Sequence, residues 1–230
     1  PALQLYDWFV RPILYDLASD CIDILAVVLA DGLRTIPIAA MHDGQQFLVE
    51  SYSLGLMPTF SLTQFSTQDT LLETDNRQVL AMGASRFKNQ PALPAVEAEL
   101  ALITQQRWAN ETFLNEEFTL DNLKSQIASS RHNILHLATH ANFETGDQSD
   151  SYIQLWDERI NLDMLKELAL DESDIELIIL SACNTAMGDR RSEYGFAGFA
   201  VSTGAQSALA SLWPVSDEGT LGIKTQFYER

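Results

Sequence analysis

An imidazole and a thiol, the two side chains on which cysteine catalysis depends, each follow an apolar segment of this sequence. His140 comes directly after the segment 134–139, and Cys183 follows the segment 177–181 after one intervening residue. The thiolate is the nucleophile in such chemistry, and a neighbouring imidazole can accept the thiol proton and return it to the leaving group. If the two segments are neighbouring strands of one sheet, the pair could carry out acyl transfer.

Each of these residues also has a simpler interpretation. A lone cysteine at the end of an apolar strand is commonly just a small buried side chain, and an isolated histidine is commonly a core residue. The joint placement of His140 and Cys183, with small or polar neighbours around both, favours catalysis. His136 has the same side-chain parity as His140 but lies inside its strand, so we expect a core histidine with bonded polar atoms. Ser181 lacks the Gly-x-Ser-x-Gly elbow of serine nucleophiles.

The elements that would position the pair alternate between strand and helix from about residue 78 onward. We predict strands over 78–83, 112–114, 134–139, 176–181 and 207–212. We predict helices over 92–106, 120–129, 162–169, 194–203 and 217–228, with Thr119 and Asp217 suited to capping the helices near them. This alternation predicts a mostly parallel sheet with helices on both faces, in which functional groups gather at the carboxyl ends of the strands.

The first 77 residues have a different pattern, so we divide the chain into the portions 1–77 and 78–230. Apolar spacing over 3–17 predicts a helix that kinks or restarts at Pro12. A β-hairpin region is predicted next. It consists of a buried strand at 24–29, a turn at 31–32, an extended piece at 35–39, a second turn at 42–44 and a last extended piece at 47–49. The polar residues 61–77 predict a connector.

Charge and cysteine content exclude several classes of function. The 230 residues carry 14 basic and 32 acidic side chains, a formal net charge of -18, which would repel nucleic acid and anionic membrane surfaces. Two cysteines are too few for a disulfide scaffold, and we expect Cys21 to pack in the interior. No spacing of Cys and His resembles a zinc site, so we expect no metal and no cofactor.

The chain also lacks the marks of a membrane or secreted protein. Its longest apolar run, 22–30, contains Asp23 and is far shorter than the roughly 20 residues that span a bilayer. No secretory signal pattern opens the chain, so we predict a cytoplasmic protein. The sequence stops inside or just after the last predicted helix, at Arg230, and we therefore expect it to be part of something longer.

Four motifs in order resemble those of a CHAT domain. They are ILHLATH at 134–140, LSACNTAMG at 180–188, YGFAGFA at 194–200 and SLWPVSD at 211–217, and the DGLRTIP of 31–37 and HDG of 42–44 are also similar. The resemblance therefore spans nearly the whole chain. CHAT domains belong with caspases, separases, metacaspases and gingipains. Membership implies a caspase-like three-layer α/β sandwich in which Cys183 is the nucleophile and His140 the acid and base.

The same resemblance implies further site residues. The backbone N–H groups of Cys183 and Ala141 would hold the acyl oxyanion. Caspase-like proteins usually have glycine where this chain has Ala141, and a Cβ there restricts the φ angle. Asp217 matches the residue with which separases supply an acidic group to the pocket for a basic side chain, although it is equally suited to a helix N-cap. Trp213 would line the same pocket or pack in the core.

The function implied is that of a cysteine endopeptidase that cleaves a specific protein partner after a basic residue and under regulation. CHAT domains commonly accompany tetratricopeptide repeats in bacteria. No 34-residue helical repeat occurs here, so such an array or another regulatory domain would lie outside this chain. Two alternatives stay open. One is a catalytically silent CHAT domain that serves as a protein-interaction module. The other is a small-molecule or nucleotide-binding α/β domain, for which residues 83–85 are a very short phosphate-loop signal.

Overall fold

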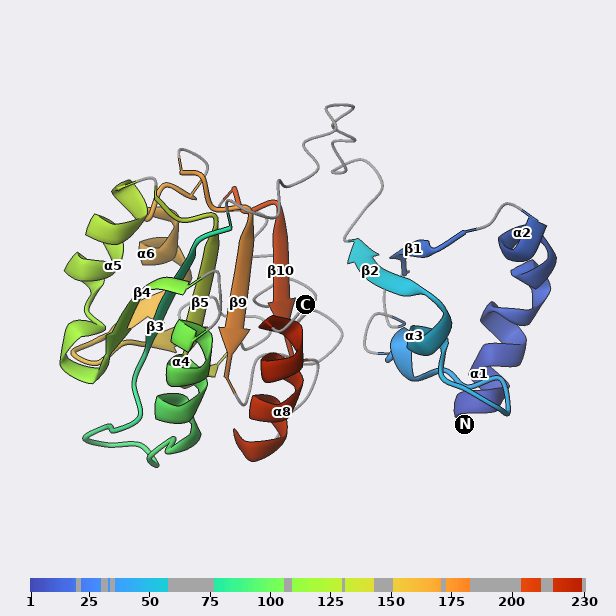
Figure 1. The fold of residues 1–230 in the computed structure, drawn as a ribbon, viewed down its shortest axis with the longest axis horizontal. Coiled ribbons are helices and arrows are strands. Elements are labelled where there is room, and N and C mark those ends of the chain that lie inside the picture. The colour runs from blue at the N-terminus through green and yellow to red at the C-terminus, as the bar shows by residue number, and fades with distance from the viewer. Residues whose placement is uncertain are drawn as a thin grey trace. The chain divides into compact units, whose positions relative to one another are not determined.

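The structure is a computed structural model (Figure 1). It describes residues 1–19, 22–29, 33, 36–57, 77–105, 109–129, 131–142, 151–170, 173–182, 204–211 and 217–228. The chain divides into two compact units, Pro1–Gln68 and Asp69–Arg230, and each is described by itself. Besides the candidate site residues Cys183 and Trp213, four sequence predictions fall wholly or almost wholly outside the described residues: the packing of Cys21, the turn at 31–32, the connector at 61–77 and the helix at 194–203.

The second unit is built on a five-stranded parallel sheet. Its strands are β3 (Val79–Gly83), β4 (Ala109–Leu114), β5 (Ile134–Ala138), β9 (Leu177–Ser181) and β10 (Ser207–Ala210). They lie in the order β10-β9-β5-β3-β4, and every pairing between neighbours is parallel. The predicted α/β class and mostly parallel sheet are therefore confirmed, and the architecture is consistent with a caspase-like sandwich.

Helices cover both faces of this sheet (Figure 1). The elements α5 (Leu120–Ala128) and α6 (Leu162–Lys166) pack on one face, and α4 (Ala95–Gln105) and α8 (Asp217–Tyr228) pack side by side on the other. Thr119 caps α5, because its side chain accepts a hydrogen bond from the Asn122 amide at 3.3 Å. The α6 helix ends at Lys166 rather than at residue 169, and Ala169 adopts a left-handed φ of 49°.

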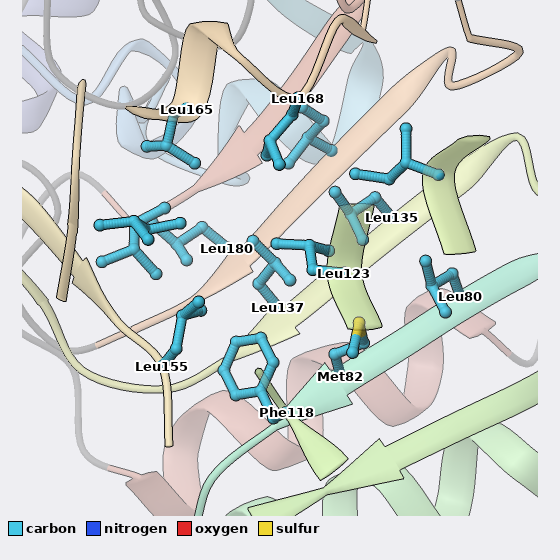
Figure 2. Close-up of a cluster of buried hydrophobic side chains, with 14 of the residues drawn as sticks. Leu80, Met82, Phe118, Leu123, Leu135, Leu137, Leu155, Leu165, Leu168 and Leu180 are labelled. Carbon is cyan, nitrogen blue, oxygen red and sulfur yellow. The ribbon is translucent and has the colours of Figure 1, made fainter. Parts of the chain in front are cut away.

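Strand side chains alternate between the two helical layers, as the pleat of a β-strand requires. Those directed toward α5 and α6 form a leucine-rich core together with Phe118 and Met82 (Figure 2). Those directed toward α4 and α8 form a smaller second core that includes Val79, Ala81, Ile134, Ala138 and Ile179. The strands β3 and β5 are buried along their whole length, which explains why they are apolar in sequence except for His136.

A small antiparallel sheet continues from the carboxyl end of β5. It consists of β6 (Ala141–Asn142), β7 (Tyr152–Gln154) and β8 (Arg159–Asn161). Only Thr139 and His140 separate β5 from β6, so the chain is held by the parallel sheet before the candidate histidine and by the antiparallel sheet after it.

The first unit begins with a broken helix, as predicted. The helix α1 (Ala2–Phe9) is followed by a 3-10 turn (Arg11–Ile13) that contains Pro12 and then by α2 (Leu14–Ser19). Proline removes a backbone donor inside a helix, which accounts for the break. Of the helices in the described part of the chain, none is long and apolar enough to cross a membrane.

The prediction of a β-hairpin in this unit is wrong, because the two strands that form are parallel. β1 (Ile24–Val28) pairs in parallel with β2 (Ser53–Met57), a strand that we did not predict. The expected extended pieces form a 3-10 helix (Ile38–Ala40) and α3 (Leu48–Ser51) instead. Local bonds explain α3, since the Glu50 carboxylate accepts from the Phe47 amide at 2.6 Å.

The strand β1 is also less buried than its apolar sequence suggests. Ile24 is 70% exposed and Val28 45% exposed in the structure, while Leu29 just after the strand is buried. The turn at 42–44 is present as predicted, with Gly44 at a φ of 111° and a β-bridge between His42 and Phe47.

Candidate active site

The strands that precede His140 and Cys183 are neighbours in the sheet. β5 and β9 pair in parallel with Ala138 opposite Ser181, and the Thr139 amide donates to the Ser181 carbonyl at 3.1 Å. His140 and Cys183 each lie two residues beyond their member of that pair along the chain. Cys183 itself is outside the described residues. His140 therefore lies next to the carboxyl end of β9, the strand that Cys183 follows in sequence.

The ring of His140 is held by the loop between β3 and α4. Its Nε2 lies 2.8 Å from the carbonyl oxygen of Pro91, and the Phe87 ring packs against it with centroids 4.6 Å apart. A carbonyl oxygen can only accept a hydrogen bond, so Nε2 carries the proton and Nδ1 keeps the free lone pair of the neutral imidazole. The ring is partly exposed. This arrangement leaves Nδ1 as the ring atom that can accept a proton.

Asn115 holds the start of the loop that contains Phe87 and Pro91. The Asn115 Oδ1 accepts from the Ser85 amide at 2.9 Å, and the Leu93 amide donates to the Ser85 carbonyl at 2.8 Å, which closes the loop. Asn115 is buried and has a φ of 53°, a conformation that asparagine tolerates better than most residues. Sequence reasoning did not identify Pro91, Phe87 or Asn115.

Close backbone packing joins β3 to β5 at the same edge. A Cβ added to Gly83 would lie 2.5 Å from the Ala138 carbonyl oxygen and 3.0 Å from Val96 Cγ1. The Ala138 carbonyl also accepts from the Ala84 amide at 3.0 Å. Gly83 is thus explained by packing, which weakens the phosphate-loop interpretation of residues 83–85.

We therefore expect Gly83→Ala to lower the free energy of unfolding by about 2 kcal/mol, because the new methyl group displaces the backbone of β5. Urea denaturation measures the effect. Gly222→Ala is a matched control, since nothing lies within 4 Å of a Cβ added there and alanine favours the helix α8. Equal stability of the two variants would contradict the close approach.

Ala141, the candidate oxyanion residue, is buried in β6, and its N–H forms no ladder hydrogen bond to β7. The Gln154 amide donates to the His140 carbonyl at 2.9 Å, and Ala141 lies opposite Ile153. This pattern makes Ala141 and Ile153 a non-hydrogen-bonded pair of the antiparallel ladder. Among the described residues other than glycine, only Asn115 and Ala169 have positive φ, so alanine is not strained at position 141.

The two candidate substrate-binding residues are not located by the structure. Asp217 is the first residue of α8, but its side chain is outside the described part, and Trp213 is wholly outside it. Within the ranges that are described, no group of three or more His, Cys, Asp or Glu side chains is arranged to hold a metal ion.

His136 is a core histidine with both ring nitrogens in contact with polar groups, as predicted. Its Nδ1 lies 2.8 Å from the Tyr228 hydroxyl, and its Nε2 lies 3.0 Å from Glu99 Oε1. The second oxygen of that carboxylate, Oε2, accepts from the Ser181 hydroxyl at 2.9 Å. Ser181 is therefore engaged by a carboxylate, and Glu99 is another residue that sequence reasoning missed.

The protonation states of this buried group follow from its surroundings. Burial alone would raise the pKa of Glu99, but the hydrogen bond and charge of His136, the Lys224 cation and the Ser181 hydroxyl lower it to about 2. Burial lowers the pKa of His136 despite the Glu99 carboxylate, and burial raises the pKa of Tyr228. The group therefore consists of an anionic Glu99 that lies against the Lys224 cation, the Ser181 hydroxyl and the His136 ring, whose Nδ1 lies against the Tyr228 hydroxyl.

Comparison with known proteins identifies a family and several similar solved structures. The family model described as "CHAT domain" matches residues 1–230. The crystal structure of protein GSU0716 from Geobacter sulfurreducens is similar with 15% sequence identity and a TM-score of 0.36, over 67% of this chain and 62% of that one. The chain thus spans less than two thirds of that protein. No curated protein matches the sequence significantly.

Proposed function

Because the chain belongs to the CHAT domain family, which is caspase-like, we propose that it is a cysteine endopeptidase with Cys183 as nucleophile and His140 as acid and base. The observation that carries the proposal is the register of β5 and β9. Both residues follow, by the same two positions, a pair of residues that face each other across neighbouring parallel strands. The hydrogen bond between Pro91 and Nε2 adds support, since it leaves Nδ1 as the basic atom.

The proposed reaction proceeds in two acyl-transfer steps. Nδ1 of His140 takes the thiol proton, and the Cys183 sulfur attacks the scissile carbonyl carbon, whose oxygen becomes an anion. The N–H groups of Ala141 and Cys183 hold that oxyanion. His140 then gives its proton to the leaving amine, and the C–N bond breaks to form a thioester. In the second step His140 takes a proton from water and the hydroxide attacks the thioester carbon. The C–S bond then breaks, the acid product leaves, and His140 returns the proton to the Cys183 sulfur.

For the substrate we propose a specific protein that is cleaved after Arg or Lys. Asp217 would pair with the basic side chain, and Trp213 would line the same pocket. A carboxylate that forms two parallel hydrogen bonds with a guanidinium group discriminates strongly against neutral side chains. We further propose that tetratricopeptide repeats or another regulatory domain, located outside this chain, control access to the site.

The test uses fluorogenic peptides that present Arg, Lys, Asp or Leu on the acyl side of the cleaved bond. The purified chain should cleave the Arg or Lys peptides, and an acyloxymethyl ketone with the same side chain should label it. Cys183→Ala should abolish both signals. Asp217→Ala should lower the preference for Arg over Leu by at least about 100-fold, whereas Asp121→Ala, on the exposed first turn of α5, should leave it unchanged.

A second measurement separates a latent enzyme from an interaction module. Alkylation of Cys183 by iodoacetamide, followed over pH by mass spectrometry, reports the thiolate without any substrate. A thiol pKa well below that of a free cysteine supports the catalytic pair even in a latent enzyme. An ordinary thiol with neither turnover nor labelling contradicts the proposal and favours a catalytically silent module.

A further inference from the structure

A buried carboxylate that the proposed mechanism does not use lies beneath the carboxyl end of the sheet. Glu99, on α4, is only 3% exposed. Its Oε1 lies 3.0 Å from His136 Nε2 and 3.2 Å from Lys224 Nζ, and its Oε2 accepts from the Ser181 hydroxyl at 2.9 Å. One carboxylate thus contacts β5, β9 and α8 from a fourth element, α4.

The two strand residues that Glu99 contacts lead to the two candidate catalytic residues. His136 precedes His140 by four positions on β5, and Ser181 precedes Cys183 by two positions on β9. Both side chains lie on the face of the sheet that α4 and α8 cover, in agreement with strand alternation. Glu99 therefore joins the two strands through side chains near the carboxyl end of their paired segment, beyond which their backbones separate.

That separation is visible in the backbone hydrogen bonds. The Thr139 amide still donates to the Ser181 carbonyl, but the next residue, His140, directs its carbonyl to the Gln154 amide of β7. The chain beyond β5 thus pairs with the small antiparallel sheet instead of with β9. Near this branch point, the contacts of Glu99 add a second connection between the two strands.

The charge of Glu99 is balanced from α8. Lys224 is 8% exposed and supplies the cation, and Tyr228 of the same helix bonds His136. A buried ion pair is costly to desolvate and is often no more stabilising than apolar side chains of the same size. The stability of the fold therefore does not by itself account for a charged group at this place.

We propose that Glu99 is a positioning residue that sets the placement of the chain ends carrying His140 and Cys183, with Ser181 as its link to the nucleophile. This inference rests on the proposed peptidase function for its catalytic consequence, but the placement itself is a property of the fold. Since α8 begins at Asp217, the same group connects the nucleophile strand to the helix that bears the candidate substrate residue.

Ser181→Ala tests the link because it removes one hydroxyl and no charge. Ser173→Ala is the matched control: the Ser173 hydroxyl donates to the Leu170 carbonyl at 2.8 Å, and it lies near the amino end of β9, away from the site. Hydrogen exchange at the Thr139 amide reports whether the two strand ends are held together. We expect exchange at Thr139 to be about 10-fold faster in Ser181→Ala and unchanged in Ser173→Ala.

The catalytic consequence is measured on the same proteins. With a fluorogenic Arg peptide, kcat should fall about 10-fold in Ser181→Ala with KM unchanged. The rate at which iodoacetamide alkylates Cys183 should also depend on pH differently from the wild type. Glu99→Gln combined with Lys224→Met removes both charges together and should give the same two changes.

The outcomes separate this inference from the proposed function. Unchanged exchange at Thr139 together with an unchanged alkylation profile overturns the positioning role, even if the wild type is an active peptidase. Faster exchange at Thr139 in Ser181→Ala supports the positioning role, even if the wild type shows an ordinary thiol and no turnover.

Discussion

Replacing His140 with alanine is expected to lower the turnover of an Arg peptide by about 1000-fold while the fold persists. The imidazole is the only general base in the proposed reaction, and without it most of the thiol stays protonated. Within the described part of the chain, the ring of His140 makes a hydrogen bond to the Pro91 carbonyl and packs against Phe87, and it is partly exposed. Stability should therefore change by only about 1 kcal/mol, as measured by urea denaturation.

Two further measurements make the His140 result specific. His42→Ala removes a partly exposed histidine from the first unit, where its Nδ1 accepts from the Gly44 amide, and it should leave turnover unchanged. Added imidazole should restore part of the activity of His140→Ala but none of that of Cys183→Ala. If His140→Ala retains more than about a tenth of the wild-type kcat, this histidine is not the base.

The second large effect is expected on stability, when the buried charge of Glu99 is removed. Glu99→Gln leaves the Lys224 cation buried beside a neutral amide, so the free energy of unfolding at pH 7 should fall by about 3 kcal/mol. As a control, Glu167→Gln breaks the exposed ion pair with Lys124, which spans 3.2 Å, and should cost about 0.5 kcal/mol or less.

The pH dependence of Glu99→Gln follows from the direction of each pKa shift. The pKa of Glu99 is lowered to about 2, so its ionised form contributes stability above its usual pKa of 4.5, and that contribution is lost as the pH falls from 4.5 toward 2. The difference between wild type and Glu99→Gln should therefore shrink below pH 4.5. Parallel stability curves in this range would contradict the lowered pKa.

His136 adds an earlier loss of stability in acid. Its pKa is lowered from 6.5 in the folded protein, so protons bind the unfolded chain more readily once the pH falls below 6.5. The wild type should therefore begin to lose stability near pH 6.5, before Glu99 titrates. Urea denaturation at intervals between pH 8 and pH 3 resolves both stages.

The second unit was largely predictable from sequence because its strands are buried on both faces. Segments such as 134–139 and 176–181 are mostly apolar, and the rule that sites lie at the carboxyl ends of strands pointed to His140 and Cys183. The first unit was less predictable. Its short extended pieces were decided by local capping and by a parallel pairing between strands almost 30 residues apart, β1 and β2, which no local pattern indicates.

The supporting residues of the site could not be predicted for a related reason. Pro91 meets His140 across 49 positions of sequence, and Ser181 meets Glu99 across 82. A glutamate inside a helix normally indicates a solvent-exposed surface, and nothing in the pattern around Glu99 shows that it is buried. Asn115 offered a weak signal, since asparagine is among the few residues that accept positive φ.

The strand order β10-β9-β5-β3-β4 places a topological switch point between β3 and β5. From β3 the chain moves by way of α4 to β4 on one side, whereas from β5 it moves to β9 on the other, so the connections diverge between β3 and β5. Open α/β sheets bind their ligands at such a topological switch point. The loop with Pro91 and the residues after β5 border it. Insertions or substitutions in these loops can thus alter the surface at the switch point while the register of β5 and β9 stays intact, so the loops can diverge without disturbing the strand pairing on which the proposed peptidase mechanism depends.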